Sequence, residues 1–158
     1  MEKDDSSTLS RKIDRDLPPS GVVEVNKDLC IGCRTCEMLC SMSHEGASSH
    51  VLARIRVFKD PFNAAYVPKV CKQCPSPNCL LVCPVEGAFT VDNETGARII
   101  LHDLCNRCGM CAEACPWGLI WYDQQKDVYL KCDLCGGDPR CVDFCPTGSL
   151  LYIQRGIE

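Results

Sequence analysis

Residues 105–116 read Cys-Asn-Arg-Cys-Gly-Met-Cys-Ala-Glu-Ala-Cys-Pro. Three cysteines at two-residue intervals lie on one tight loop, where they can hold three corners of a [4Fe-4S] cubane. The fourth cysteine begins a segment that points away, and in two-cluster ferredoxins it ligates the other cluster. The proline after it fixes φ at about −65° and keeps the chain from folding back onto the loop. This stretch therefore predicts a ferredoxin-type fold built around iron–sulfur clusters.

The same pattern occurs four times and uses every cysteine of the chain. The first and third motifs have the ferredoxin spacing C-x2-C-x2-C-x3-C, whereas the second and fourth carry small insertions between the second and third cysteines. Ser41 replaces the proline after motif one, which predicts a helix that continues from Cys36 through Ser43. The predicted iron ligands are Cys30, Cys33, Cys36 and Cys40; Cys71, Cys74, Cys79 and Cys83; Cys105, Cys108, Cys111 and Cys115; and Cys132, Cys135, Cys141 and Cys145.

Two other uses of cysteine fit this spacing less well. Disulfides need an oxidising compartment, and structural zinc usually takes its four ligands from two separated C-x2-C pairs. Neither accounts for runs of three closely spaced cysteines with a remote fourth. We therefore expect four [4Fe-4S] clusters. Because no cysteine is spare and no Gly-rich nucleotide loop occurs, we expect a non-catalytic electron carrier rather than an enzyme in its own right.

Composition narrows the class further. The chain has 158 residues and a net charge of −4, which argues against nucleic-acid binding. It contains no run of about 18 or more apolar residues, so no membrane span is predicted. Residues 1–20 are polar, lack the apolar segment of a secretory signal, and are predicted to form an extension. Residues 21–158 are then the four-cluster polyferredoxin, and a cytoplasmic location is expected.

Short apolar segments precede the motifs and are typical of strands. These segments are Val22–Val25, Ala65–Val67, Arg98–Leu101 and Val128–Leu130. A hairpin is predicted between Phe89 and Leu101, with its turn at residues 92–96, and a further strand at residues 54–58. We therefore expect an α+β fold of two ferredoxin-like units in one compact chain, with short antiparallel β-ribbons and short helices around the clusters.

The four-motif arrangement between Val22 and Ile153 resembles the electron-transfer subunits of molybdenum and tungsten oxidoreductases, such as those of the dimethyl sulfoxide reductase and formate dehydrogenase complexes. The resemblance implies that motif one pairs with motif four, over about residues 22–60 and 126–153, and motif two with motif three, over about residues 65–125. Within each pair the fourth cysteines are exchanged. Because motif three is complete, no [3Fe-4S] centre is expected.

This resemblance implies four ligand sets. They are Cys30, Cys33, Cys36 and Cys145 for cluster 1; Cys132, Cys135, Cys141 and Cys40 for cluster 2; Cys71, Cys74, Cys79 and Cys115 for cluster 3; and Cys105, Cys108, Cys111 and Cys83 for cluster 4.

Residues 30–41, with 44–46 and 53–57, are similar to the small ferredoxin-type subunit of tungsten-containing aldehyde oxidoreductases and of related benzoyl-CoA reductase complexes. The similarity implies a catalytic partner that holds a tungsten or molybdenum pterin, and a second partner that is a flavin subunit with FAD or another carrier. Three alternatives are open. The chain could be a free polyferredoxin, or a subunit of another molybdenum or tungsten enzyme, such as one of the benzoyl-CoA reductase, formate dehydrogenase or dimethyl sulfoxide reductase type. It could also belong to a larger assembly with further copies of itself.

Several side chains beside the motifs could have special roles. The basic residues next to the cluster loops are Arg34, Lys72, Arg107, Lys131 and Arg140. They could offset cluster charge, but we favour a solvated surface with an aliphatic stem. The aromatic residues Trp117, Trp121 and Tyr122 are expected to pack between the two halves rather than to lie on an electron path. His44 is expected at a turn or helix start, because the cysteines already satisfy four clusters.

Overall fold

A computed structural model describes residues 17–155 of the chain. Most of the predicted extension, residues 1–16, lies outside the described residues. The strands are β1 (Val22–Val25), β2 (Ile55–Asp60), β3 (Ala65–Val70), β4 (Phe89–Val91), β5 (Arg98–Ile100), β6 (Trp121–Asp123), β7 (Val128–Leu130) and β8 (Leu150–Ile153). The helices are α2 (Thr35–Glu45), α3 (Asn78–Leu81), α4 (Met110–Glu113) and α5 (Arg140–Asp143), with 3-10 turns η1 (Lys27–Leu29) and η2 (Leu134–Gly137).

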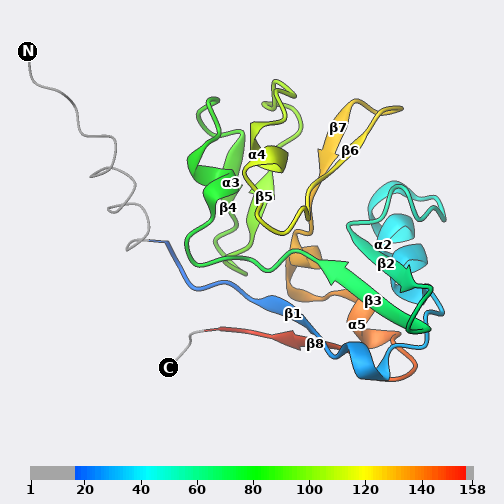
Figure 1. Ribbon diagram of the computed structural model, residues 1–158. Helices are drawn as coiled ribbons and strands as arrows, with labels where there is room; N and C mark the ends of the chain where they lie inside the picture. The colour runs from blue at the N-terminus through cyan, green and yellow to red at the C-terminus, as the bar shows by residue number, and fades with distance from the viewer. Residues whose placement is uncertain (1–16, 156–158) are drawn as a thin grey trace, which may run out of the picture.

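The strands pair in twos and form antiparallel ribbons. Three ribbons, β2–β3, β4–β5 and β6–β7, connect neighbours in sequence, whereas β1–β8 joins the two ends of the described chain. In that ribbon Val22 lies opposite Ile153 and Val25 opposite Leu150, and the two strands run side by side in Figure 1. The predicted strands and the hairpin between Phe89 and Leu101 are confirmed, and the fold is of the α+β type.

The length of the helix in each motif depends on which residue comes after the fourth cysteine. Helix α2 has 11 residues and passes through Cys40 and Ser41, as predicted, until Gly46 ends it in the left-handed conformation at φ 67°. Helices α3, α4 and α5 have only 4 residues each. Each of the three stops shortly before a proline, which disfavours helical backbone in the residue before it. Motif one therefore has the only long helix in residues 17–155.

The apolar core is small and consists partly of cysteine. The larger of two buried clusters combines Val23, Ile55, Leu134 and Leu150 with four cysteines, and the smaller one contains Phe89, Cys111 and Ile120. Figure 1 shows α3, α4 and the β4–β5 ribbon on one side, and α2, α5 and the β2–β3 ribbon on the other. Thiol side chains therefore occupy the places that aliphatic side chains fill in an ordinary core of this size. None of the helices in residues 17–155 has the length and apolar character needed to cross a membrane.

The turn of the β4–β5 ribbon lies against the chain that leads into β1. Gly21 N–H donates a hydrogen bond to the Thr95 carbonyl at 3.0 Å. Gly96 has φ +69°, and a Cβ atom there would lie 2.1 Å from the Pro19 carbonyl oxygen. Gly46 also has a positive φ, +67°, but a Cβ atom there would have no neighbouring atom within 4 Å.

We predict that Gly96→Ala destabilises the cluster-loaded chain more than Gly46→Ala. Both variants bear the cost of a left-handed alanine, about 1–2 kcal/mol. Only Gly96→Ala also forces two backbone segments apart. The measurement is the guanidinium midpoint of unfolding followed by far-ultraviolet circular dichroism. Equal midpoints for the two variants would show that the turn does not press against residues 19–20.

Candidate iron–sulfur sites

Four cavities are each lined by four cysteines, three from one motif and the fourth cysteine of another. We call these cavities sites 1 to 4, and each site has the number of the predicted cluster with the same four cysteines. Site 1 contains Cys30, Cys33, Cys36 and Cys145. Site 2 contains Cys40, Cys132, Cys135 and Cys141. Site 3 contains Cys71, Cys74, Cys79 and Cys115. Site 4 contains Cys83, Cys105, Cys108 and Cys111. The structure therefore brings together the members of each quartet that the family resemblance implies.

Helix geometry explains the exchange of the fourth cysteine. The third and fourth cysteines of every motif are four residues apart, about one helical turn. Cys36 on α2 reaches site 1, whereas Cys40 on the next turn reaches site 2. The same division holds for Cys79 and Cys83, which border sites 3 and 4. One helical turn therefore links two neighbouring cavities.

The cysteine loops contain most of the unusual backbone in residues 17–155. Seven residues other than glycine have positive φ, and those within the cysteine motifs are Arg34, Gln73, Arg107, Leu134 and Cys135. Such backbone costs about 1–3 kcal/mol per residue and persists only where the surroundings enforce it. Left-handed residues curl each loop tightly, which lets three successive cysteines face one point.

Backbone donors point at several sulfur atoms. Arg54 N–H donates to Cys40 Sγ at 3.2 Å, and Gln73 N–H donates to Cys71 Sγ at 3.4 Å. Leu119 N–H donates to Cys115 Sγ at 3.4 Å. Hydrogen bonds to ligand sulfurs lower the electron density on them and help set the potential of an iron–sulfur cluster. These donors suit anionic sulfur ligands better than neutral thiols.

The donor sets fit iron–sulfur clusters. All sixteen cysteines are free thiols, so no disulfide competes for them. Burial raises the pKa of Cys36 to about 12 and that of Cys79 to about 12. Burial likewise raises the pKa of Cys111 to about 11. Thiols this crowded stay protonated unless a metal takes the place of their protons. Four cysteine sulfurs around one cavity are the ligand set of a [4Fe-4S] cluster.

The cavities follow one another in the order 1, 2, 3, 4. Helices α2 and α5 link sites 1 and 2. Helix α2 contains Cys36 of site 1 and Cys40 of site 2, and α5 contains Cys141 of site 2 and ends shortly before Cys145 of site 1. Helices α3 and α4 link sites 3 and 4 in the same way. Sites 2 and 3 meet at Cys132 and Cys71, because both side chains belong to the larger buried group of the apolar core. The Gln73 side-chain amide joins them by donating to the Cys132 carbonyl at 2.8 Å.

The two outer sites each contain an exposed cysteine, and site 2 is the most deeply buried of the four. Cys33 in site 1 and Cys108 in site 4 are the exposed members of the sixteen cysteines. In site 2, by contrast, Cys40, Cys132 and Cys141 are all buried. The line of cavities therefore reaches solvent at both ends.

His44 lies in the wall of site 2, in the last turn of α2, so the expectation of a turn or helix start was wrong. Its Nδ1–H donates to the Cys40 carbonyl at 2.8 Å, and its Nε2–H donates to Asp133 Oδ1 at 2.9 Å. Burial disfavours the charged ring, but the contacts with Asp133, Cys135 and Cys40 outweigh it and raise the pKa of His44 to about 12. With both nitrogens occupied, the side chain ties motif one to motif four.

The expectations for two further side chains outside the cysteine set need correction. Lys131 is only 5% exposed, although a solvated position was expected, because it follows β7 directly into the space between sites 2 and 3. Trp117 is 57% exposed and does not pack between the two halves. Neither outcome has a signal in the sequence, since burial here depends on how the two groups of elements meet.

Two family descriptions match the chain. A 4Fe-4S dicluster domain matches residues 62–155, and a 4Fe-4S binding domain matches residues 22–47. Together they cover all four cysteine motifs. They support the prediction that the cysteines hold [4Fe-4S] clusters rather than zinc or disulfides.

Curated relatives come from archaea and bacteria. The polyferredoxin-like subunit of an aliphatic sulfonate oxidoreductase from Pyrococcus furiosus is 44% identical over 92 residues, which is 58% of this chain and 52% of that protein. A tetrathionate reductase subunit from Archaeoglobus fulgidus is 32% identical over 111 residues, 70% of this chain and 52% of that protein. Formate hydrogenlyase subunit 2 of Escherichia coli is 38% identical over 98 residues, 62% of this chain and 46% of that protein. The chain thus spans about half the length of these relatives.

A solved structure shares the fold. The active-site complex BamBC of benzoyl coenzyme A reductase, with benzoyl-CoA bound, contains a chain with a TM-score of 0.52 and 25% identity. The match covers 89% of this chain and 83% of that chain. The names of the relatives agree with the prediction of a non-catalytic electron-transfer subunit. Because the dicluster description covers more than half of the chain, this protein belongs to the 4Fe-4S dicluster domain family.

Proposed function

We propose that each of the four sites holds one [4Fe-4S] cluster and that the chain relays single electrons along the line from site 1 to site 4. The observation that carries the proposal is the series of four cysteine-lined cavities, in which one helical turn links site 1 to site 2 and another links site 3 to site 4. A bound [4Fe-4S] cluster supplies one-electron redox chemistry at a potential that its surroundings set. The protein contributes the ligands, the spacing, the donors to sulfur and the exclusion of water.

The proposed division into two units follows the motif pairs. One unit combines motifs one and four, over residues 22–60 and 126–153, and the other combines motifs two and three, over residues 65–125. The β1–β8 ribbon and the His44–Asp133 hydrogen bond support the first unit. The second rests on the α3 and α4 cysteines that line sites 3 and 4. Sites 2 and 3 would then transfer electrons between the units.

We place the points where electrons enter and leave at the two outer sites. Exposed apolar side chains accompany the exposed cysteines there. Ile31, in the site 1 loop, is 61% exposed, and Leu104, directly before Cys105 of site 4, is 52% exposed. The choice of these two ends rests on the exposed cysteines, and the apolar side chains beside them would lie in the contact with a partner.

The partner we favour is a catalytic subunit with a tungsten or molybdenum pterin, in an aldehyde oxidoreductase complex, with a flavin subunit or another carrier at the opposite end. Support comes from the similarity of residues 30–41 to the small subunits of such complexes and from relatives that are themselves subunits of oxidoreductases. A complex of the benzoyl-CoA reductase, formate dehydrogenase or dimethyl sulfoxide reductase type and a free polyferredoxin are the competing possibilities.

We predict that the anaerobically reconstituted chain binds about sixteen irons, four for each cysteine quartet. Ligand exchange can be tested by combining variants. Cys115→Ser should remove no further cluster from a chain that already lacks Cys71, Cys74 and Cys79. It should remove a second cluster from a chain that lacks Cys105, Cys108 and Cys111. Iron and sulfide analysis with electron paramagnetic resonance provides the readout, and the reverse pattern would mean that Cys115 serves its own motif.

We also predict that the tagged chain purifies from its native cells in a complex that contains a pterin and stoichiometric tungsten or molybdenum. Gel filtration and elemental analysis of the same fractions check this. Cys33→Ser is expected to leave assembly intact while altering the cluster at site 1. Elution of the wild-type chain alone, at the size of a single small protein and free of both metals, would favour the free polyferredoxin instead.

A further inference from the structure

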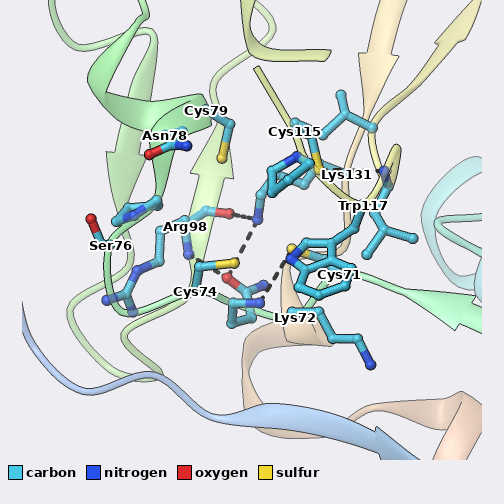
Figure 2. A pocket seen from close by; sticks show the side chains of 15 residues that line it. Cys71, Lys72, Cys74, Ser76, Asn78, Cys79, Arg98, Cys115, Trp117 and Lys131 are labelled. Carbon is cyan, nitrogen blue, oxygen red and sulfur yellow. Dashed lines mark hydrogen bonds between the residues drawn. The ribbon is translucent and has the colours of Figure 1, made fainter. Parts of the chain in front are cut away.

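Lys131 is a buried cation in the wall of site 3. It directly follows β7 and is 5% exposed. The residues that line the site 3 cavity include Lys131, Arg98 and the four cysteines. In Figure 2 the Lys131 side chain reaches into the cavity, toward the sulfur atoms of the cysteines labelled around it. Lys131 therefore faces the place where a cluster at site 3 would lie.

Among the described residues the Lys131 ammonium group donates hydrogen bonds to neutral oxygens alone, and it lies 5.8 Å from the centroid of the Phe89 ring. It donates to the Arg98 carbonyl, to Gln73 Oε1 at 3.3 Å and to the Cys132 carbonyl at 3.3 Å. Within residues 17–155 no carboxylate forms an ion pair with it. A buried charge without a counter-ion is strongly unfavourable. An anionic cluster in the cavity that Lys131 faces would supply a balancing negative charge.

Arg98 adds a second cation to the same cavity. It is 2% exposed, its Nη1 donates to the Gly96 carbonyl at 2.5 Å, and its buried Nε has no hydrogen-bond partner. It too forms no ion pair with a carboxylate in the described part of the chain. Site 3 is thus bordered by two buried basic side chains that no carboxylate of residues 17–155 pairs with.

Sites 1 and 2 have a different charge balance. At site 1, Arg34 is half exposed, and the Glu37 carboxylate on α2 is 4% exposed and lies 4.0 Å from it. At site 2, the two basic side chains are each paired with a carboxylate. The pairs are His44 with Asp133 at 2.9 Å, and Arg54 with Glu45 at 3.2 Å. The cations at these two sites are therefore exposed or already balanced.

Site 4 has no charged side chain among its lining residues apart from the cysteines. Arg107, in its loop, is 44% exposed and pairs with Asp127 at 3.1 Å. Among the four sites in the described chain, buried and unbalanced positive charge therefore occurs at site 3 alone.

We propose that Lys131, together with Arg98, gives the cluster at site 3 the highest reduction potential of the four. The first electron to enter the line then rests at site 3, one of the two inner sites. The inference builds on the proposed function, because it needs clusters in the sites. Reduction adds one electron, and no bond forms or breaks. A nearby buried cation stabilises the added negative charge, and the interaction is much stronger in a protein interior than across water. Lys131 acts here through its positive charge and does not ligate iron.

The test is a potentiometric titration of the reconstituted full chain, followed by electron paramagnetic resonance. Lys131→Met keeps the aliphatic stem and removes the charge. One cluster should become at least tenfold harder to reduce, a fall of 59 mV or more for a one-electron couple. The other three clusters should change less. Lys131→Arg retains the charge and should keep the wild-type potentials.

Lys72→Met is the matched control. Lys72 also lines site 3 and follows Cys71, but it is exposed, and in Figure 2 it points away from the cavity. Its charge is screened by water, so its loss should shift the same cluster much less. Equal shifts for the two variants, or no shift in Lys131→Met with full iron content, would overturn the proposal.

A second measurement needs no change at Lys131. Cys79→Ser alters a ligand of site 3 and should change the signal that appears first on reduction. Cys111→Ser alters site 4 and should leave that first signal in place. The opposite result would overturn the proposal even if Lys131→Met failed to fold. A wild-type chain with far fewer than four clusters would instead contradict the proposed function, and iron analysis tells the two failures apart.

Discussion

Two cysteines one helical turn apart, facing different cavities, are the constraint on which this structure depends. Every motif places its third cysteine in one site and its fourth in the neighbouring site. Cys36 and Cys40 do this on α2, and Cys111 and Cys115 do it at α4. No motif can complete its own site, so the motifs must fold together. The same geometry sets the two sites of each pair one helical turn apart, and contacts of Cys132 and Cys71 bring sites 2 and 3 together.

Much else follows from building the interior around metal sites. In the described residues, 17–155, buried apolar side chains form two small groups, and both contain cysteine. The loops accept left-handed backbone at Arg34, Gln73 and Arg107, which an ordinary hydrophobic core would not enforce. Folding and cluster binding are therefore expected to be coupled, as in other small metal-containing domains. Charge placement then becomes the main means by which the protein distinguishes four chemically similar sites.

The sequence alone was sufficient for the cysteine motifs, the strands before them and the long helix at Ser41, because each of these depends on local spacing. It was not sufficient for features that arise where distant segments meet. His44 sits 89 residues from Asp133 in sequence, and their hydrogen bond spans motifs one and four. Lys131 appeared to be one of several basic loop residues, yet its burial depends on contacts with Gln73 and Arg98. No local pattern carries that information.

Anomalous scattering at the iron edge, from crystals of the reconstituted chain, can determine the order and the ligands of the four sites. We expect four groups of iron atoms in the order 1, 2, 3, 4. Each group should be ligated by three cysteines of one motif and the fourth cysteine of its partner motif. A cluster held by the four cysteines of a single motif, or a break in the line between Cys132 and Cys71, would contradict it.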